Sequence, residues 1–292
     1  MKYVEAGVLR VAYEEHGDPS GSPVVLLHGF PYDVRAYDEV APRVAAAGAR
    51  VLIPYLRGYG PTQFLDSSTL RSGQQAALAT DLHSFMDALG LSRTVLAGFD
   101  WGGRAACIVS ALWPERVTGL VTQNGYNVQD IAHSGQPARP ENEWRHWYQY
   151  YFHGERGRAG LAANRQELCR LLWRLWSPKW DFDDATYART AQSFDNPDFV
   201  DVVIHSYRHR FALAGGDPSL EEIEKRIAML PEISVPTIHL DGLDDGVSAV
   251  GGTAAPAGHF TGPYEFRAVS DAGHNVPQEA PEAFAEAVID TM

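Results

Sequence analysis

The sequence has few cysteines, no long apolar run and no surplus of positive charge, and each of these absences excludes a class of protein. Only Cys107 and Cys169 occur among 292 residues, both in stretches with a helical pattern, so no disulfide is expected. No apolar run reaches the length of about 20 residues that a membrane-spanning helix needs. Internal repeats and low-complexity segments are also absent. The sequence therefore predicts a soluble globular protein.

Basic residues are scarce relative to acidic ones. The chain carries 24 Lys and Arg against 37 Asp and Glu, which gives a formal net charge of −13. Nucleic acids and anionic membranes are bound through clustered positive charge, so we expect neither as a partner. The first 15 residues alternate like a hairpin and lack the apolar core, about 7–15 residues long, of a signal peptide. We therefore expect a cytoplasmic protein.

Strand patterns and helix patterns alternate along the first part of the chain. Strands are predicted at 24–28, 51–54, 94–99 and 117–122, and helices at 36–47, 72–89 and 104–113. This order predicts an α/β fold with a mostly parallel central sheet flanked by helices, in which ligands bind beyond the carboxyl ends of the strands.

The pattern changes between residues 125 and 230, where it becomes irregular, helix-rich and aromatic. Strands resume at 237–241 and 264–270 and are followed by a terminal helix that starts at Gln278 or Pro281. We expect residues 1–124 and 231–292 to form one core and residues 125–230 to form an inserted helical cap. A length of 292 residues with 45% hydrophobic content suffices for one such core with a lid.

The most informative stretch is Gly98-Phe99-Asp100-Trp101-Gly102, where a strand pattern meets a helix pattern. Small residues on both sides of a central polar residue are typical of a sharp turn that exposes a nucleophile above the sheet. The pKa of free aspartate is about 3.9, so Asp100 is an anion at neutral pH and can attack a saturated carbon directly. The product would be an ester on Asp100, whose hydrolysis requires a general base and an oxyanion hole.

Candidates for both are present. His274 follows the 264–270 strand and precedes the terminal helix, which suits a general base, and Asp245 lies in an acidic turn after the 237–241 strand, which suits the acid that orients it. The backbone N–H groups of Phe30 and Trp101 are the expected oxyanion-hole donors. Each signal alone also occurs in proteins without such a site. Together, in this order and each at a strand end, they predict a catalytic assembly.

The chain resembles the α/β-hydrolase superfamily, and within it the epoxide hydrolases, over essentially its whole length. The residues that carry the resemblance are His28-Gly29-Phe30-Pro31, Arg57-Gly58-Tyr59-Gly60 and Phe99-Asp100-Trp101-Gly102-Gly103. The order nucleophile, acid, histidine also agrees with this superfamily. The resemblance implies a cofactor-independent hydrolase that opens an organic epoxide to a vicinal diol.

Opening an epoxide releases a basic alkoxide, which calls for a proton donor. Two aromatic segments in the expected cap resemble those from which epoxide hydrolases present a pair of tyrosines, and the match points to Tyr148 and Tyr207. A stretch this dense in aromatic residues is also typical of a packed helical core. The aromatic cap favours an apolar or aromatic epoxide as the substrate.

Dehalogenases of the same superfamily share the aspartate nucleophile, so a haloalkane or haloacetate dehalogenase is the alternative. Haloacetate dehalogenases resemble the chain at Arg104 and at His146-Trp147, which makes His146 and Trp147 candidate substrate-binding residues. They carry arginine directly after the nucleophile, where this chain has Trp101. Arg104 itself could instead cap or pair within its own helix. A scaffold that binds a ligand without catalysis is a third interpretation.

The proposed chemistry requires no cofactor and no metal. His205 and His209 have the i, i+4 spacing of one helix face, but no carboxylate or cysteine nearby completes a ligand set. We therefore expect a small-molecule substrate as the only ligand. The sequence leaves the oligomeric state open, with a homodimer as one option.

Overall fold

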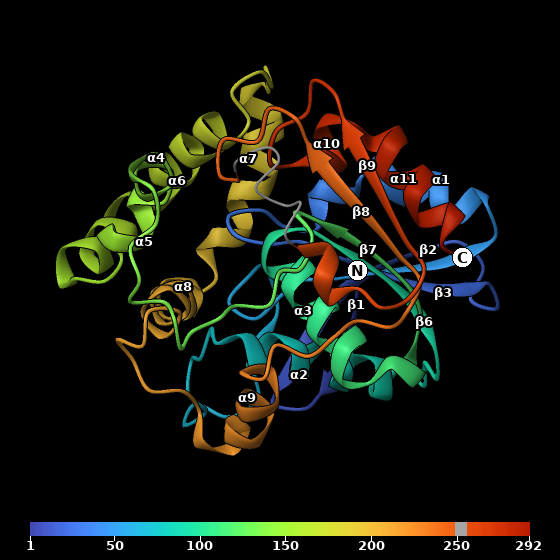
Figure 1. The fold of residues 1–292 in the computed structure, drawn as a ribbon, viewed down its shortest axis with the longest axis horizontal. Helices are drawn as coiled ribbons and strands as arrows, with labels where there is room; N and C mark the ends of the chain where they lie inside the picture. Colours follow the sequence, from blue (N-terminus) through green and yellow to red (C-terminus); the bar gives the residue numbers. More distant parts are fainter. Residues whose placement is uncertain (249–255) are drawn as a thin grey trace.

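A computed structural model describes residues 1–248 and 256–292, and within this part of the chain nine strands form one twisted sheet (Figure 1). Their spatial order is β1-β2-β4-β3-β6-β7-β8-β9, and β5 pairs with β2. The strands are β1 (Lys2–Ala6), β2 (Leu9–His16), β3 (Ser22–Leu27), β4 (Ala49–Pro54), β5 (Gln63–Phe64), β6 (Thr94–Gly98), β7 (Val117–Gln123), β8 (Thr237–Gly242) and β9 (Tyr264–Val269). Strands β4, β3, β6, β7, β8 and β9 are parallel, and β1 and β2 form an antiparallel hairpin. The predicted mostly parallel sheet is confirmed.

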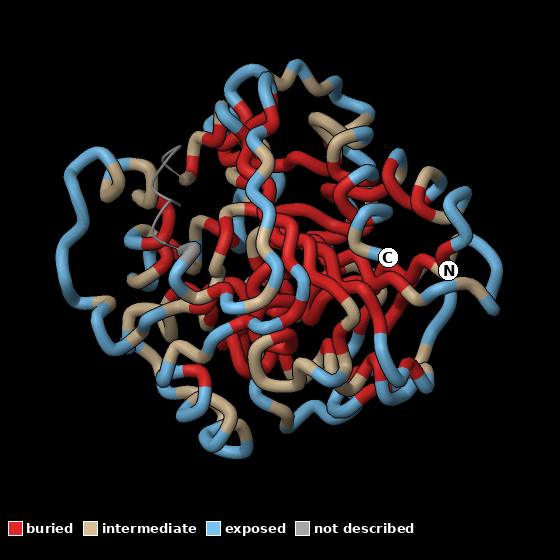
Figure 2. Tube along the Cα trace, turned by 45° about the vertical axis from the view of Figure 1, so that its right-hand side comes forward, coloured by how far each residue is buried: buried red, intermediate tan, exposed pale blue. Residues whose placement is uncertain are grey.

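Helices cover both faces of the sheet (Figure 1). Helices α1 (Val40–Ala46) and α11 (Pro281–Asp290) pack together on one face, and α2 (Gln75–Ala88) and α3 (Asp100–Leu112) pack on the other. Strand β6 is buried at every residue, as expected for a parallel strand covered on both faces. Figure 2 shows the buried residues concentrated in the strands and the exposed residues in the outer loops.

Three helix starts differ from the sequence prediction, and one of them is that of α2, which begins at Gln75 and not at residue 72. The helix expected from residue 36 is split into a 3-10 turn (Val34–Tyr37) and α1, which begins only at Val40. Asp33 caps the start of this short turn, because its side chain accepts a hydrogen bond from the N–H of Arg35. Helix α3 begins at Asp100, four residues before the predicted start, because the turn after β6 leads directly into the helix. The terminal helix is divided into α10 (Val276–Glu279) and α11.

The chain between β7 and β8 carries six helices within its described residues: α4 (Pro140–Arg145), α5 (Trp147–Tyr151), α6 (Glu155–Trp176), α7 (Asp184–Ala191), α8 (Phe199–His209) and α9 (Glu221–Ile227). Helices α4, α5, α6 and α8 lie together to one side of the sheet (Figure 1). Helix α9 instead packs against α2 and α3. The division into core and cap stays a prediction, and this packing favours a cap that ends before α9.

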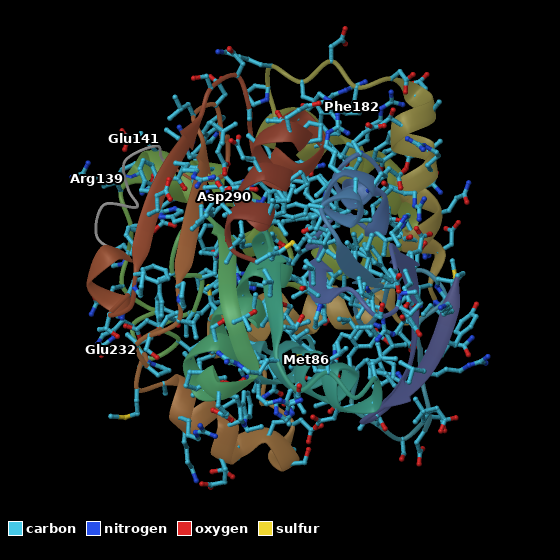
Figure 3. The ribbon with its side chains drawn as sticks, turned by 90° about the vertical axis from the view of Figure 1, so that its right-hand side faces the viewer. Met86, Arg139, Glu141, Phe182, Glu232 and Asp290 are labelled. Atoms are coloured by element: carbon cyan, nitrogen blue, oxygen red, sulfur yellow. The ribbon has the colours of Figure 1, made fainter. Side chains whose placement is uncertain are left out.

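Side-chain positions follow the same division between surface and interior. In Figure 3, Arg139 and Glu141, at the start of α4, lie at the periphery, and Met86 of α2 lies among packed side chains. Cys107 and Cys169 are both buried as free thiols. Within the described residues, no helix combines the length and the apolar character that crossing a membrane requires.

Candidate active site

Asp100 occupies the turn between β6 and α3 in a strained backbone conformation, with φ of +50°. Glycine is required on both sides of it. A Cβ atom on Gly102 would lie 2.1 Å from the carbonyl oxygen of Leu27, and one on Gly98 would lie 2.7 Å from the carbonyl carbon of Gly102. The two glycines therefore allow the start of α3 to pack closely against the ends of β3 and β6, which places Asp100 at the carboxyl ends of the parallel strands.

The loop after β3 contacts the carboxylate of Asp100 directly. The backbone N–H of Phe30 donates a hydrogen bond of 2.7 Å to Oδ1. A Cβ atom on Gly29 would lie 2.4 Å from the same oxygen, so glycine allows this close approach. Burial raises the pKa of Asp100, but His274, Arg104 and the N–H of Trp101 together bring it below the ordinary value. Asp100 is therefore an anion at neutral pH, with Oδ1 held by the backbone.

His274 lies between two carboxylates. Its Nδ1 is 2.9 Å from Asp245 Oδ2, and its Nε2 is 3.7 Å from Asp100 Oδ2. Burial lowers the pKa of His274, but the charges and hydrogen bonds of Asp245 and Asp100 outweigh burial and raise it to about 10. With Asp100 ionised, the imidazole is therefore protonated at neutral pH.

Asp245 is held by a set of donors besides His274. Its Oδ1 accepts from the N–H groups of Val247 (2.6 Å) and Ser248 (3.0 Å), and its Oδ2 accepts from Asn124 Nδ2 (2.9 Å). Burial raises the pKa of Asp245, but His274 and the N–H groups of Ser248 and Val247 outweigh burial and bring it below its ordinary value. The neighbouring Asp244 points elsewhere and pairs with Lys179 at 2.9 Å.

Asn124 and Glu279 are site residues that the sequence prediction missed. Asn124 ends β7 with φ of +64°, and Glu279 accepts hydrogen bonds from the backbone N–H groups of Gly273 (2.7 Å) and Asn275 (2.9 Å), on either side of His274. The available signal was a polar run, Gln123-Asn124-Gly125, at the end of an apolar strand. Both residues fix the loops that carry the acid and the histidine.

The predicted tyrosine pair comes together from two helices beside the sheet (Figure 1). Tyr148 lies on α5 and Tyr207 on α8, and their ring centres are 5.4 Å apart. The ring of Tyr207 is 5.5 Å from that of Phe30 and 6.0 Å from that of Trp101. Burial raises the pKa of Tyr148 to about 12 and raises that of Tyr207 well above its ordinary value, so both hydroxyls keep their protons at neutral pH.

His146 and Trp147 have different surroundings. His146 joins α4 to α5, and burial together with the charge of Arg210 lowers its pKa to about 4, so it is neutral. Trp147 packs against Tyr148 and Tyr151, with ring centres 6.4 and 6.2 Å away. No ring contact joins Trp147 to Phe30 or Trp101 among the described residues.

Three buried polar atoms around Asp100 lack a hydrogen-bond partner of normal geometry within the described residues. They are Trp101 Nε1, the hydroxyl oxygen of Tyr207 and His274 Nε2. Buried polar groups are nearly always satisfied, so such a group in a native interior calls for an explanation. These three groups are candidates for contact with a bound molecule next to Asp100.

A family model described as alpha/beta hydrolase fold matches residues 22–281. The chain belongs to the α/β-hydrolase family. This match confirms the family predicted from the sequence motifs.

The relatives of this α/β-hydrolase include epoxide hydrolases. It is 46% identical to a “putative epoxide hydrolase” from Klebsiella pneumoniae, with a TM-score of 0.98 and coverage of 99% of this chain and 96% of that one. It is 34% identical over 121 residues to bifunctional epoxide hydrolase 2 of Sus scrofa (41% of this chain, 21% of the relative) and over 122 residues to a haloalkane dehalogenase of Mycobacterium marinum (40% and 39%). The matched stretches thus span less than half the length of these curated relatives.

The spacing of His205 and His209 raised the possibility of a metal site in this α/β-hydrolase. The rings of His205 and His209 stack 5.7 Å apart. His205 Nδ1 accepts from the N–H of Gly73, and its Nε2 is 3.0 Å from the carbonyl oxygen of Gly215. In residues 1–248 and 256–292, no group of three or more His, Cys, Asp or Glu side chains could hold a metal ion.

Proposed function

We propose that this α/β-hydrolase opens an organic epoxide to a vicinal diol through an ester on Asp100. The observation that carries the proposal is the pair of buried, protonated hydroxyls of Tyr148 and Tyr207 beside the Asp100 turn. An alkoxide leaving group needs such proton donors, whereas a halide does not. The similarity to epoxide hydrolases supports the same activity.

In the first half of the reaction, Oδ2 of Asp100 is the attacking atom, because Oδ1 is engaged by the N–H of Phe30. Oδ2 forms a bond to one ring carbon while the bond between that carbon and the ring oxygen breaks. The ring oxygen takes a proton from one tyrosine and becomes a hydroxyl. Oδ1 becomes the ester carbonyl oxygen, which the N–H groups of Phe30 and Trp101 are positioned to stabilise.

In the second half, water must attack the ester carbonyl carbon. His274 takes the proton from that water through Nε2, while Asp245 stabilises the imidazolium through Nδ1. The tetrahedral intermediate collapses as the bond between the ester carbonyl carbon and Oδ2 breaks. Oδ2 leaves on the substrate carbon and takes the proton from His274, which makes it the second hydroxyl of the diol. The other proton of the water leaves the Asp100 carboxyl and restores the tyrosine. The sum of both halves is epoxide plus water to diol.

Halide displacement by the same nucleophile is the second candidate. The observation that favours it is the buried Nε1 of Trp101, an N–H donor without a partner in the described part of the chain, which could bind a departing halide. The similarity to a haloalkane dehalogenase agrees with it. Only the tyrosine pair, as a proton donor to an alkoxide, favours epoxide opening over halide displacement.

The test uses His274→Gln, which leaves the nucleophile intact and removes the base. After addition of styrene oxide or a simple alkyl epoxide, intact-mass spectrometry should show protein heavier by one substrate, and peptide mapping should place the adduct on Asp100. Asp100→Asn in the same background should prevent the adduct.

Wild-type turnover is measured in parallel as diol formation and as halide release from halogenated substrates. Diol without halide release supports the epoxide hydrolase. Halide release alone moves the dehalogenase ahead, an adduct on any residue other than Asp100 refutes the mechanism, and the absence of both turnover and adduct favours a non-catalytic scaffold.

A further inference from the structure

The end of helix α6 lies against both loops that carry the candidate acid and base. The carbonyl oxygen of Trp176, the last residue of α6, accepts hydrogen bonds from the N–H of Gly246 at 2.9 Å and from the N–H of His274 at 3.1 Å. Carbonyl groups in the last turn of a helix have no partner within the helix, and one carbonyl oxygen can accept two hydrogen bonds. Gly246 directly follows Asp245, so a single oxygen atom of α6 joins the acid loop to the histidine loop.

Glycine stands at both points where these loops meet residues 175–177, which we call the α6 terminus. A Cβ atom on Gly246 would lie 2.0 Å from the carbonyl oxygen of Leu175, and one on Gly273 would lie 2.6 Å from the Cα atom of Ser177. Neither glycine has a positive φ, so glycine is needed here for space and not for its backbone conformation. The two loops therefore pack directly against the backbone of the α6 terminus.

The hydroxyl of Ser177 adds a side-chain link from α6 to the histidine loop. It donates to Glu279 Oε1 at 2.5 Å, and Glu279 in turn accepts from the N–H groups of Gly273 and Asn275, on either side of His274. Ser177 is buried, and a buried polar group that loses its partner costs free energy. The link therefore holds the α6 terminus and the histidine loop in one arrangement.

The side chain of Trp176 connects the base to a candidate proton donor. Its buried ring has its centre 5.2 Å from that of His274 and 5.0 Å from that of Tyr148. Aromatic rings at these separations are in packing contact. The α6 terminus thus contacts the base through the backbone and through this ring.

We propose that the α6 terminus is the positioning element for the Asp245–His274 pair, with the carbonyl group of Trp176 as its central contact. The inference rests on the proposed function and deepens it. Asp245 and His274 lie on separate loops, and the 2.9 Å contact between them requires both loops to be fixed. Asp100 is held by its own turn and by the N–H of Phe30. Loosening the α6 terminus should therefore slow hydrolysis of the ester more than attack on the epoxide.

The test separates these two steps in the variants Gly273→Ala and Ser177→Ala. After rapid mixing with styrene oxide, intact-mass spectrometry follows the formation of the covalent adduct and its later loss. Gly273→Ala should slow adduct loss by about 10²-fold, as expected for a displacement of about 1 Å, and Ser177→Ala by roughly tenfold, as expected for one hydrogen bond. Both variants should form the adduct at close to the wild-type rate.

Gly154→Ala is the matched control, because Gly154 precedes the other end of α6 and an added Cβ atom would meet nothing within 4 Å. It should leave both rates unchanged. Thermal unfolding identifies the folded variants, and Ser177→Ala alone decides if Gly273→Ala does not fold. Equal slowing of adduct formation and adduct loss, or an unchanged rate of adduct loss in folded Ser177→Ala, overturns the positioning role.

The double variant Gly273→Ala, Ser177→Ala shows whether the two changes act through the same contact. If they do, the second substitution adds little to the effect of the first, because groups in contact are not energetically independent. Fully additive effects on the rate of adduct loss would mean that Gly273→Ala acts within its own loop, and they would overturn the inference.

A measurement without substrate distinguishes this inference from the proposed function. The NMR signal of the proton on His274 Nδ1 reports on the contact with Asp245. The signal should shift or broaden in Gly273→Ala and Ser177→Ala and stay in place in Gly154→Ala. If no adduct forms even in the wild type but the signal changes in this way, the positioning role stands and the epoxide hydrolase proposal fails. A signal that is unchanged in folded Ser177→Ala overturns the positioning role itself.

Discussion

The pKa of His274 should depend on the charge of Asp100, and Asp100→Asn tests this dependence. Asparagine keeps the shape of the side chain but is neutral, as the ester on Asp100 would be. His274 must lose its proton before it can act as a base on water. The substitution therefore reproduces the electrostatic state in which the base has to work.

The expected change follows from the geometry. Asp100 Oδ2 is 3.7 Å from His274 Nε2. With an effective dielectric constant of about 20, two unit charges at this separation interact by about 4.5 kcal/mol, or roughly three pKa units. The pKa of His274, held at about 10 in the wild type, should fall by two to three units, as an order-of-magnitude expectation, to about 7 in Asp100→Asn. Asp245 remains in place and prevents a further fall.

The assay is a titration of the imidazole by NMR, with the His274 signal assigned by its absence in His274→Gln. The wild-type signal should keep its protonated shift from pH 6 to 8, and the signal of Asp100→Asn should titrate within that range. A pKa change of less than one unit would refute the reasoning that esterification releases the base.

The raised pKa of His274 also makes the free energy of unfolding depend on pH. Because the pKa is raised on folding, the contribution of His274 to stability is fully present below its ordinary pKa of 6.5 and is lost as pH rises to about 10. In Asp100→Asn this loss should be nearly complete by pH 8. Urea unfolding at pH 6, 8 and 10 measures both proteins.

Two further predictions separate residues that the sequence alone treats alike. Asp245→Asn should slow ester hydrolysis by orders of magnitude, because the imidazole of His274 then adopts the wrong tautomer; the same change in another triad costs about 10⁴-fold. Asp244→Asn loses only the pairing with Lys179, so its single-turnover kinetics should remain near normal. If Asp244→Asn were slow and Asp245→Asn normal, the roles of the two aspartates would be exchanged. The double variant Tyr148→Phe, Tyr207→Phe should open epoxides about 10²- to 10⁴-fold more slowly, with little change in the rate of halide displacement. Tyr187→Phe is the control: it removes a hydroxyl that donates to the carbonyl oxygen of Gln166, and it should not slow epoxide opening. If the double variant opened epoxides at near the wild-type rate with an unchanged melting curve, the two tyrosines would be core residues.

The nucleophile turn could be predicted because its requirements are local in the sequence. The close packing of Gly98 and Gly102 against neighbouring backbone explains why glycine stands on both sides of Asp100. His274 and Asp245 could be placed for a similar reason, since each follows a predicted strand of a parallel sheet. The 3-10 turn before α1 could not be predicted, because it begins with a hydrogen bond from the N–H of Arg35 to the side chain of Asp33, which helical spacing does not reveal.

Residues whose importance depends on distant contacts were not predictable. Asn124 reaches Asp245 across 121 positions of the chain, and its sequence neighbours indicate only the end of a strand. Helical periodicity gives the face of a residue on its own helix, but not which other helix that face meets.

In the proposed mechanism, the charges around Asp100 explain how the His274 imidazole is inactive before the attack on the epoxide and active afterwards. Before attack, two carboxylates hold His274 in its protonated form, in which it cannot deprotonate water or compete as a nucleophile. Ester formation removes one of them, and the remaining Asp245 supports the imidazole at a pKa suited to a base.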